Sequence, residues 1–136
     1  MIIGLGGGSV TDLSGFIAST YLRGVPLILI PTSLLAMVDA SIGGKTGVDT
    51  VLGKNLIGTF YPPKAIISDL DTLETLPEME KQNGLSEIIK MGLIFDPSIL
   101  SELPKTESLE VLVRKASQAK ISVITQDPLD RACGGF

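Results

Sequence analysis

Apolar residues follow two patterns along the chain: short unbroken runs near its start and helical periodicity toward its end. Met1–Leu5 and Val25–Ile30 are unbroken apolar runs bounded by turn residues, as expected of parallel strands that are covered on both faces. Between them, residues 11–21 carry the spacing of a helix, and Gly24 closes it. The pattern predicts strand, helix and strand in succession, which is one βαβ unit.

The segment that follows is rich in glycine. A short helix is expected over residues 34–38. The stretch from Ser41 to Pro63 then holds Gly43, Gly44, Gly47, Gly53 and Gly58. It is too long for a mere connection, and loops of such length are usually functional or disordered. A short strand is expected over residues 65–68.

Helical periodicity dominates after Pro77, over residues 78–94 and again over residues 108–125. In the last helix the apolar side chains share one stripe, formed by Leu109, Leu112, Val113, Ala116, Val123 and Ile124. We therefore predict an α/β fold in two parts. The first is a partial Rossmann-like nucleotide-binding domain over residues 1–76, and the second is a partial α-helical domain over residues 77–136.

Composition narrows the possible partners. The 136 residues are 44% hydrophobic, and the net charge of −4 is spread without blocks of like charge, so we expect neither nucleic acid nor a membrane as partner. Cys133 is the single cysteine, no apolar run could cross a bilayer, and Met1–Leu5 lacks the basic region and long apolar core of a signal peptide, so the cytoplasm is the expected compartment. Histidine is absent, so imidazole chemistry must come from outside this chain.

The expected sheet is small for an independent domain. Its first strand begins at residue 1 with no strand before it, and the sequence stops soon after the helix-stop signal Asp127-Pro128. We expect a central fragment of a longer protein.

Gly6, Gly7 and Gly8 lie between the first expected strand and the first expected helix. Glycines there let backbone N–H groups approach a phosphate, to which a helix N-terminus offers partial positive charge. The same glycines suit a tight turn, and the G-x-G-x-x-G fingerprint is not met because Ser9 stands at its third glycine. Asp12, expected in the first helical turn, either complements the helix dipole or reaches a ribose hydroxyl.

Polar side chains gather in the glycine-rich segment, namely Asp39, Lys45, Lys54 and Asn55. A P-loop is rejected because Asp39 stands where the first glycine of that motif belongs. Lysines in such a loop either contact phosphate or carboxylate groups or are simply solvated.

Glu87 and Lys90 are three residues apart and share one face of an expected helix. Such a pair is usually a surface ion pair of little energetic weight. Ile88, Ile89 and Leu93 make this helix apolar on several sides, so the carboxylate is either a metal ligand or a buried structural partner.

Six segments occur in a fixed order and spacing over nearly the whole chain: Gly6–Asp12, Tyr21–Pro26, Pro31–Ala36, Val38–Gly47, Leu52–Asn55 and Gly84–Lys90. Together they closely resemble the 3-dehydroquinate synthase family. Its enzymes are phosphate-eliminating lyases that depend on NAD and a divalent metal, zinc or cobalt. They convert DAHP, a seven-carbon sugar acid phosphate, to 3-dehydroquinate in the shikimate pathway of aromatic amino acid biosynthesis.

The resemblance implies roles for particular residues. NAD would be contacted by Gly8, Ser9, Val10, Thr11, Asp12, Thr32, Ser33, Lys45, Lys54, Thr72, Leu73, Glu74 and Thr75. The substrate site would be lined by Asp39, Lys45, Asn55, Glu87, Lys90 and Lys120. Glu87 would also bind the metal, and Arg23 would reach the substrate phosphate of a neighbouring subunit, so a homodimer is expected.

Two departures from the family limit this expectation. The family completes its metal site with two histidines, which this chain lacks, and Gly134 stands where a substrate-binding arginine is expected. We therefore expect no turnover by the chain alone. The alternatives are another sugar phosphate cyclase, an iron-dependent alcohol or glycerol dehydrogenase, and a non-catalytic nucleotide-binding remnant.

Overall fold

The apolar runs near the start of the chain form a parallel sheet. The structure, a computed structural model, describes residues 1–103 and 109–128, so expectations that rest on Cys133 or Gly134 lie outside the described residues. The three strands lie in the order β1-β2-β5; they are β1 (Ile2–Gly6), β2 (Leu27–Pro31) and β5 (Ala65–Ile66). Gly6 pairs with Pro31, so β1 and β2 end at the same edge of the sheet.

Helix α1 (Gly8–Thr20) connects β1 to β2 and packs against both strands. It begins at Gly8 rather than at the predicted residue 11, because Gly7 is extended and serves as the N-cap. Asp12 therefore lies beyond the first turn, where the helix dipole acts weakly. Gly4 lets the helix approach closely, since a Cβ there would lie 2.6 Å from the Ser14 hydroxyl oxygen. The predicted βαβ unit is confirmed.

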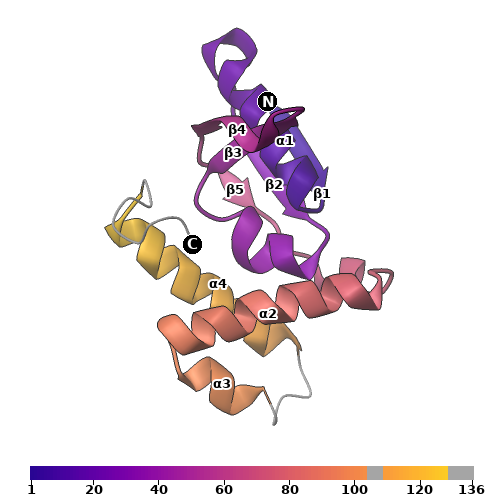
Figure 1. Cartoon of the computed structure of the whole chain (residues 1–136), viewed down its shortest axis with the longest axis vertical. Helices are drawn as coiled ribbons and strands as arrows, with labels where there is room; N and C mark the ends of the chain where they lie inside the picture. The colour runs from indigo at the N-terminus through magenta and orange to yellow at the C-terminus, as the bar shows by residue number, and fades with distance from the viewer. Residues whose placement is uncertain (104–108, 129–136) are drawn as a thin grey trace.

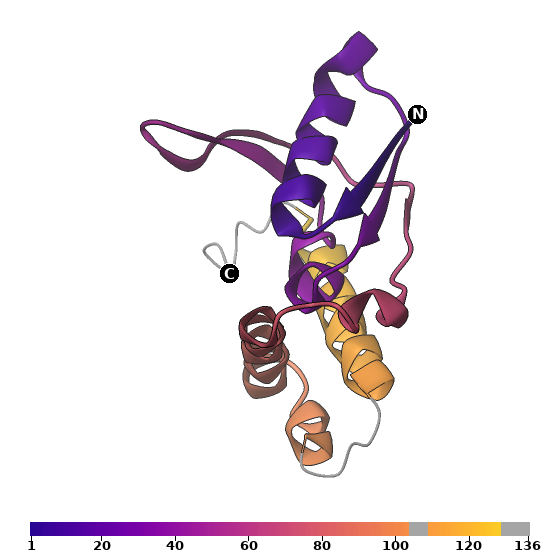
Figure 2. The same cartoon turned by 90° about the vertical axis from the view of Figure 1, so that its right-hand side faces the viewer.

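The glycine-rich segment differs from its prediction. Most of it is an antiparallel hairpin of β3 (Lys45–Thr50) and β4 (Gly53–Phe60), not an irregular loop. The Thr46 hydroxyl bonds across the hairpin to the Thr59 carbonyl at 2.8 Å. Figure 2 shows the hairpin reaching out to one side of the sheet.

A π-helical turn, η2 (Ala36–Ala40), stands where the sequence predicted a short helix over residues 34–38. The Ser41 N–H donates to the Ala36 carbonyl at 3.0 Å, which spans one residue more than an ordinary helical turn. Such wide turns occur frequently at functional sites.

Helices follow the sheet in sequence and lie at one end of it (Figure 1). After the short 3-10 turn η3 (Leu70–Leu73) they are α2 (Glu78–Ile94), α3 (Ser98–Glu102) and α4 (Leu109–Gln126). The α2 prediction is confirmed at both ends, and α4 differs from its prediction by one residue at each end. The five-residue α3 was not predicted. None of the helices in the described residues is long and apolar enough to cross a membrane.

The larger of two apolar cores joins the helices to the segment after β2. Ile88 and Met91 of α2 are fully buried there, beside Leu34, Met37 and Val38. The predicted α/β class is confirmed. The predicted boundary between residues 76 and 77 stays a prediction.

Candidate active site

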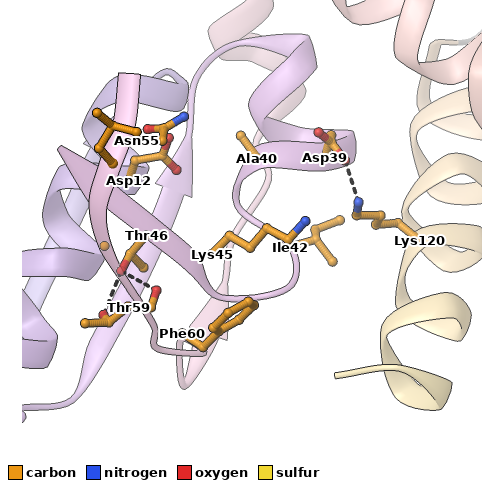
Figure 3. A pocket seen from close by; sticks show the side chains of 12 residues that line it. Asp12, Asp39, Ala40, Ile42, Lys45, Thr46, Asn55, Thr59, Phe60 and Lys120 are labelled. Carbon is orange, nitrogen blue, oxygen red and sulfur yellow. Dashed lines mark hydrogen bonds and ion pairs between the residues drawn. The ribbon is translucent and has the colours of Figure 1, made fainter. Parts of the chain in front are cut away.

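A cavity of about 470 Å³ lies between the hairpin, the π-turn η2 and α4. Five of the predicted site residues line it: Asp12, Asp39, Lys45, Asn55 and Lys120. Figure 3 shows Asp12 and Asn55 at one end of this cavity and the Asp39–Lys120 pair at the other. The sequence thus identified side chains that five separate elements bring to one place.

Asp39 and Lys120 form an ion pair across the cavity wall. The Lys120 Nζ lies 2.9 Å from one Asp39 carboxylate oxygen, and Lys120 is only 9% exposed. A lysine buried this far requires a compensating charge, because an unpaired charge in the interior is costly. The pair therefore fixes α4 against η2 and keeps two charged groups at the cavity.

A second hollow of about 430 Å³ adjoins the first along the hairpin. Its lining is Ser9, Asp12, Leu13, Gly47, Val48, Asp49, Lys54 and Asn55. Burial of the carboxyl group, together with the negative charges of Asp49 and Asp39, raises the pKa of Asp12 to about 6. Perturbed carboxyl groups in hollows are candidates for functional residues.

A third hollow, of about 330 Å³, lies where β1 and β2 end. Its lining includes predicted NAD residues from both connections, namely Gly8, Ser9, Val10, Thr32 and Ser33, and also Gly7, Leu76 and Glu80. The N-terminus of α1 opens here, and no side chain caps it. Uncapped N–H groups and the positive end of a helix dipole suit a phosphate, and open α/β sheets bind ligands at this edge. The geometry therefore fits a dinucleotide such as NAD.

The structure keeps other predicted residues away from these three hollows. Arg23 lies in η1 (Tyr21–Arg23), at the opposite end of α1 from the hollows, with a left-handed φ of 66°. Thr11 donates its hydroxyl to the Gly8 carbonyl at 2.8 Å and is 1% exposed, so its side chain serves the helix. Leu73 is buried in the helical core.

Thr72, Glu74 and Thr75 also lie outside the three hollows, in η3 or directly after it. The Thr72 hydroxyl donates to the Asp69 carbonyl at 2.6 Å. Among the described residues, this segment therefore offers no contact to the hollows as they stand.

Glu87 and Lys90 of α2 pair with each other. The described residues contain no group of three His, Cys, Asp or Glu side chains placed to hold a metal ion. A catalytic zinc ion normally takes three protein ligands. Glu87 offers one carboxylate, so the residues present do not by themselves fit such a metal.

Asp49 is a site residue that sequence reasoning missed. It lines the second hollow beside Asp12 and Lys54. Thr46, Val48 and Thr50 alternate around it, which is a strand signal that the surrounding glycines concealed. Thr59 and Phe60 of β4, which line the first cavity, were missed for the same reason.

Comparison with known proteins gives consistent matches. Residues 1–83 match the family model described as 3-dehydroquinate synthase N-terminal. The chain is 50% identical over 135 residues to the 3-dehydroquinate synthase of Pseudarthrobacter chlorophenolicus, a match that covers 93% of this chain and 37% of the relative. The chain therefore spans little more than a third of the length of the curated relatives it matches.

Two solved structures are also similar. A 2-epi-5-epi-valiolone synthase from Streptomyces hygroscopicus subsp. jinggangensis with NAD⁺ and Zn²⁺ bound matches with a TM-score of 0.88 and 32% identity, over 95% of this chain and 39% of that one. A 2-deoxy-scyllo-inosose synthase complexed with carbaglucose-6-phosphate, NAD⁺ and Co²⁺ matches with a TM-score of 0.82 and 28% identity, over 95% of this chain and 38% of that one. These similarities confirm the predicted Rossmann-like fold.

Proposed function

The chain belongs to the 3-dehydroquinate synthase family, and from this membership we propose that it supplies the nucleotide site and part of the substrate site for converting DAHP to 3-dehydroquinate and phosphate. The observation that carries the proposal is the single cavity lined by Asp12, Asp39, Lys45, Asn55 and Lys120. It combines positive charge for a carboxylate or phosphate with hydrogen-bonding groups for sugar hydroxyls.

NAD would be held along the third and second hollows. The turn from Gly7 to Val10 and the hydroxyls of Thr32 and Ser33 surround the uncapped end of α1, which suits the pyrophosphate. Asp12 and Lys54, farther along, would hold a ribose and orient the cofactor toward the first cavity. Contacts from Thr72 to Thr75 belong to the same proposal.

The chemistry divides between cofactor and protein. Bound NAD would supply a reversible hydride acceptor for a substrate alcohol and would be unchanged overall. Lys45 and Lys120 would hold the acid groups of the substrate, while Asp39 and Asn55 would orient its hydroxyls. Lys90 would join them if its pair with Glu87 opened.

Two further roles rest on the family alone. Glu87 would be one metal ligand of a site whose other ligands are not found among residues 1–103 and 109–128, so no catalytic step is derived through the metal. Arg23 would act on a partner subunit. Its exposed side chain and left-handed backbone, beside Leu22 in the same conformation, are consistent with a corner held for contact with a second copy.

A chimaera would test the proposal. Residues 1–128 replace the aligned segment of the Pseudarthrobacter chlorophenolicus relative, and phosphate release from DAHP is measured with NAD and zinc. We expect turnover, and a folded chimaera without turnover would contradict the proposal. Lys45→Ala should lower kcat/KM on the order of 10- to 100-fold through loss of a charged contact. The exposed Lys64, replaced by alanine, is the matched control.

A non-catalytic nucleotide-binding module is the second candidate, because the chain contains no histidine. Calorimetric titration of the 136-residue chain with NAD, taken together with the chimaera assay, distinguishes the cases. Saturable heat from the chain, with a folded but inactive chimaera, indicates a binding module. No heat from a folded chain would argue against both nucleotide-binding functions.

A further inference from the structure

The hairpin carries an irregularity at the point where it meets the cavity. Val48 pairs with Ile57, and Thr50 pairs with Gly53, so the register shifts between these two pairs. Asp49 alone on β3 therefore lies opposite a longer stretch of β4, residues 54–56. Bulges of this kind re-aim side chains and are frequent beside active sites.

The bulged stretch holds Lys54 and Asn55, which both line the second hollow. Asn55 has a left-handed φ of 55°, a conformation that is unfavourable for most residues with a side chain and least so for asparagine. Its side-chain oxygen would lie 3.5 Å from a Cβ at Gly47, so the amide folds over β3 at a position without a side chain.

One side chain holds this conformation. The Asn55 N–H, displaced from the regular ladder by the bulge, donates to the Asp49 Oδ1 at 3.1 Å. The contact closes a ring across the hairpin and orients the peptide unit from which both the Lys54 and Asn55 side chains leave the strand.

We propose that Asp49 is a positioning residue for the synthase reaction: its carboxylate holds the bulge at Asn55 and so aims Lys54 and Asn55 into the second hollow. The inference rests on the proposed function, because the orientation of these two side chains affects catalysis only if cofactor or substrate binds there. Asp49 acts through its neighbours, in contrast to Lys54 and Asn55, which would touch cofactor or substrate.

The charge of Asp49 has a second, separable effect. It faces Asp12 across the second hollow and contributes, after burial, to the raised pKa of that carboxyl group. Asp49→Asn removes the charge but retains a carbonyl oxygen that accepts the same hydrogen bond. Asp49→Ala removes both, so the two variants separate positioning from charge.

The first test measures amide hydrogen exchange at Asn55 in the full 136-residue chain. We expect exchange to become at least about tenfold faster in Asp49→Ala and to stay near the parent rate in Asp49→Asn. The control is Asp96→Ala, which removes a similar carboxylate contact to the Ser98 N–H at 3.0 Å, away from the hairpin. Unchanged exchange in Asp49→Ala would overturn the inference, as would equal acceleration in both Asp49 variants.

The second test measures kcat and KM for DAHP in the chimaera. Asp49→Ala should lower kcat/KM by about tenfold or more, Asp49→Asn should recover most of it, and Asp96→Ala should match the parent. Parent-like kinetics in Asp49→Ala would overturn the positioning role. An inactive parent chimaera would count against the proposed function instead, while the exchange measurement still decides whether Asp49 holds Asn55.

Discussion

Asp12 is the residue whose ionisation most clearly links stability to the site. Its pKa is about 6 in the folded chain against an ordinary value of 3.8, because the carboxyl group is half-buried and faces the charges of Asp49 and Asp39. The folded state therefore binds the proton more tightly than the unfolded state. The tighter proton binding contributes to the free energy of unfolding below pH 4, and this contribution is lost as pH rises from about 4 to 6.

Asp12→Asn is accordingly expected to stabilise the chain at pH 8 by about 1–2 kcal/mol, after allowance for solvent screening, and to have little effect at pH 4. Urea unfolding of parent and variant at the two pH values measures the difference. Equal effects at both pH values would show that the charge is not the cause. The same substitution should weaken NAD binding. The charged Asp12 would then lower stability at neutral pH while serving cofactor binding.

At the scale of elements, α1 packs closely against the hairpin near the site. A Cβ on Gly15 would lie 2.2 Å from the Thr46 Cγ2 atom, so the helix and β3 meet without room for another methyl group. The Thr59 hydroxyl also donates to the Ser19 hydroxyl oxygen at 2.9 Å, which ties β4 to the same helix. These contacts fix Asp12 relative to the hairpin.

Gly15→Ala should therefore destabilise the chain by about 1–3 kcal/mol, although alanine favours a helix over glycine by about 1 kcal/mol. Thr46→Ser removes the obstructing methyl group and keeps the hydroxyl, so it should recover part of the loss when combined with Gly15→Ala. Chemical denaturation of the single and double variants gives the coupling energy. If the free-energy changes of the two single variants simply add in the double variant, the contact between Gly15 and Thr46 does not limit stability.

Elements with one strong pattern could be predicted from the sequence. The unbroken apolar runs predicted β1 and β2, and the long apolar periodicity predicted α2 and α4, each within about two residues. The hairpin was missed because its glycines obscure a strand pattern. Its close approach to α1 depends instead on Gly15 of the helix. The charged and polar side chains of the cavity were also predicted from the sequence. Their convergence in space depends on η2 and on the bulge at Asn55, which local sequence patterns do not encode.

At the scale of the whole molecule, the larger core joins the two predicted parts. Leu34, Met37 and Val38 from the segment after β2 are buried against α2 and α4, and the Asp39–Lys120 pair adds a polar link. We therefore expect the described parts to unfold together, despite the predicted boundary between residues 76 and 77.

Two optical probes can test this expectation. Tyr21 and Tyr61 both lie before residue 77 and the chain has no tryptophan, so tyrosine fluorescence reports on the first part. Far-UV circular dichroism reports mainly on the helices. Both signals should change at the same urea concentration, and Ile88→Ala should shift both midpoints through a loss of about 2–5 kcal/mol. Separate midpoints would support two independent domains.

Because η2 is a wide turn, the direction of Asp39 toward Lys120 depends on the number of residues in the turn as well as on their types. Deletion of one residue of this turn other than Asp39 would allow an ordinary turn, in which successive residues are spaced about 100° apart, so Asp39 would take a different angular position around the axis. The aspartate would still align with Asp39 in sequence, but its carboxylate would no longer point toward Lys120. Among relatives, a one-residue gap at this turn would therefore predict a different partner for the buried lysine, even where both charged residues remain.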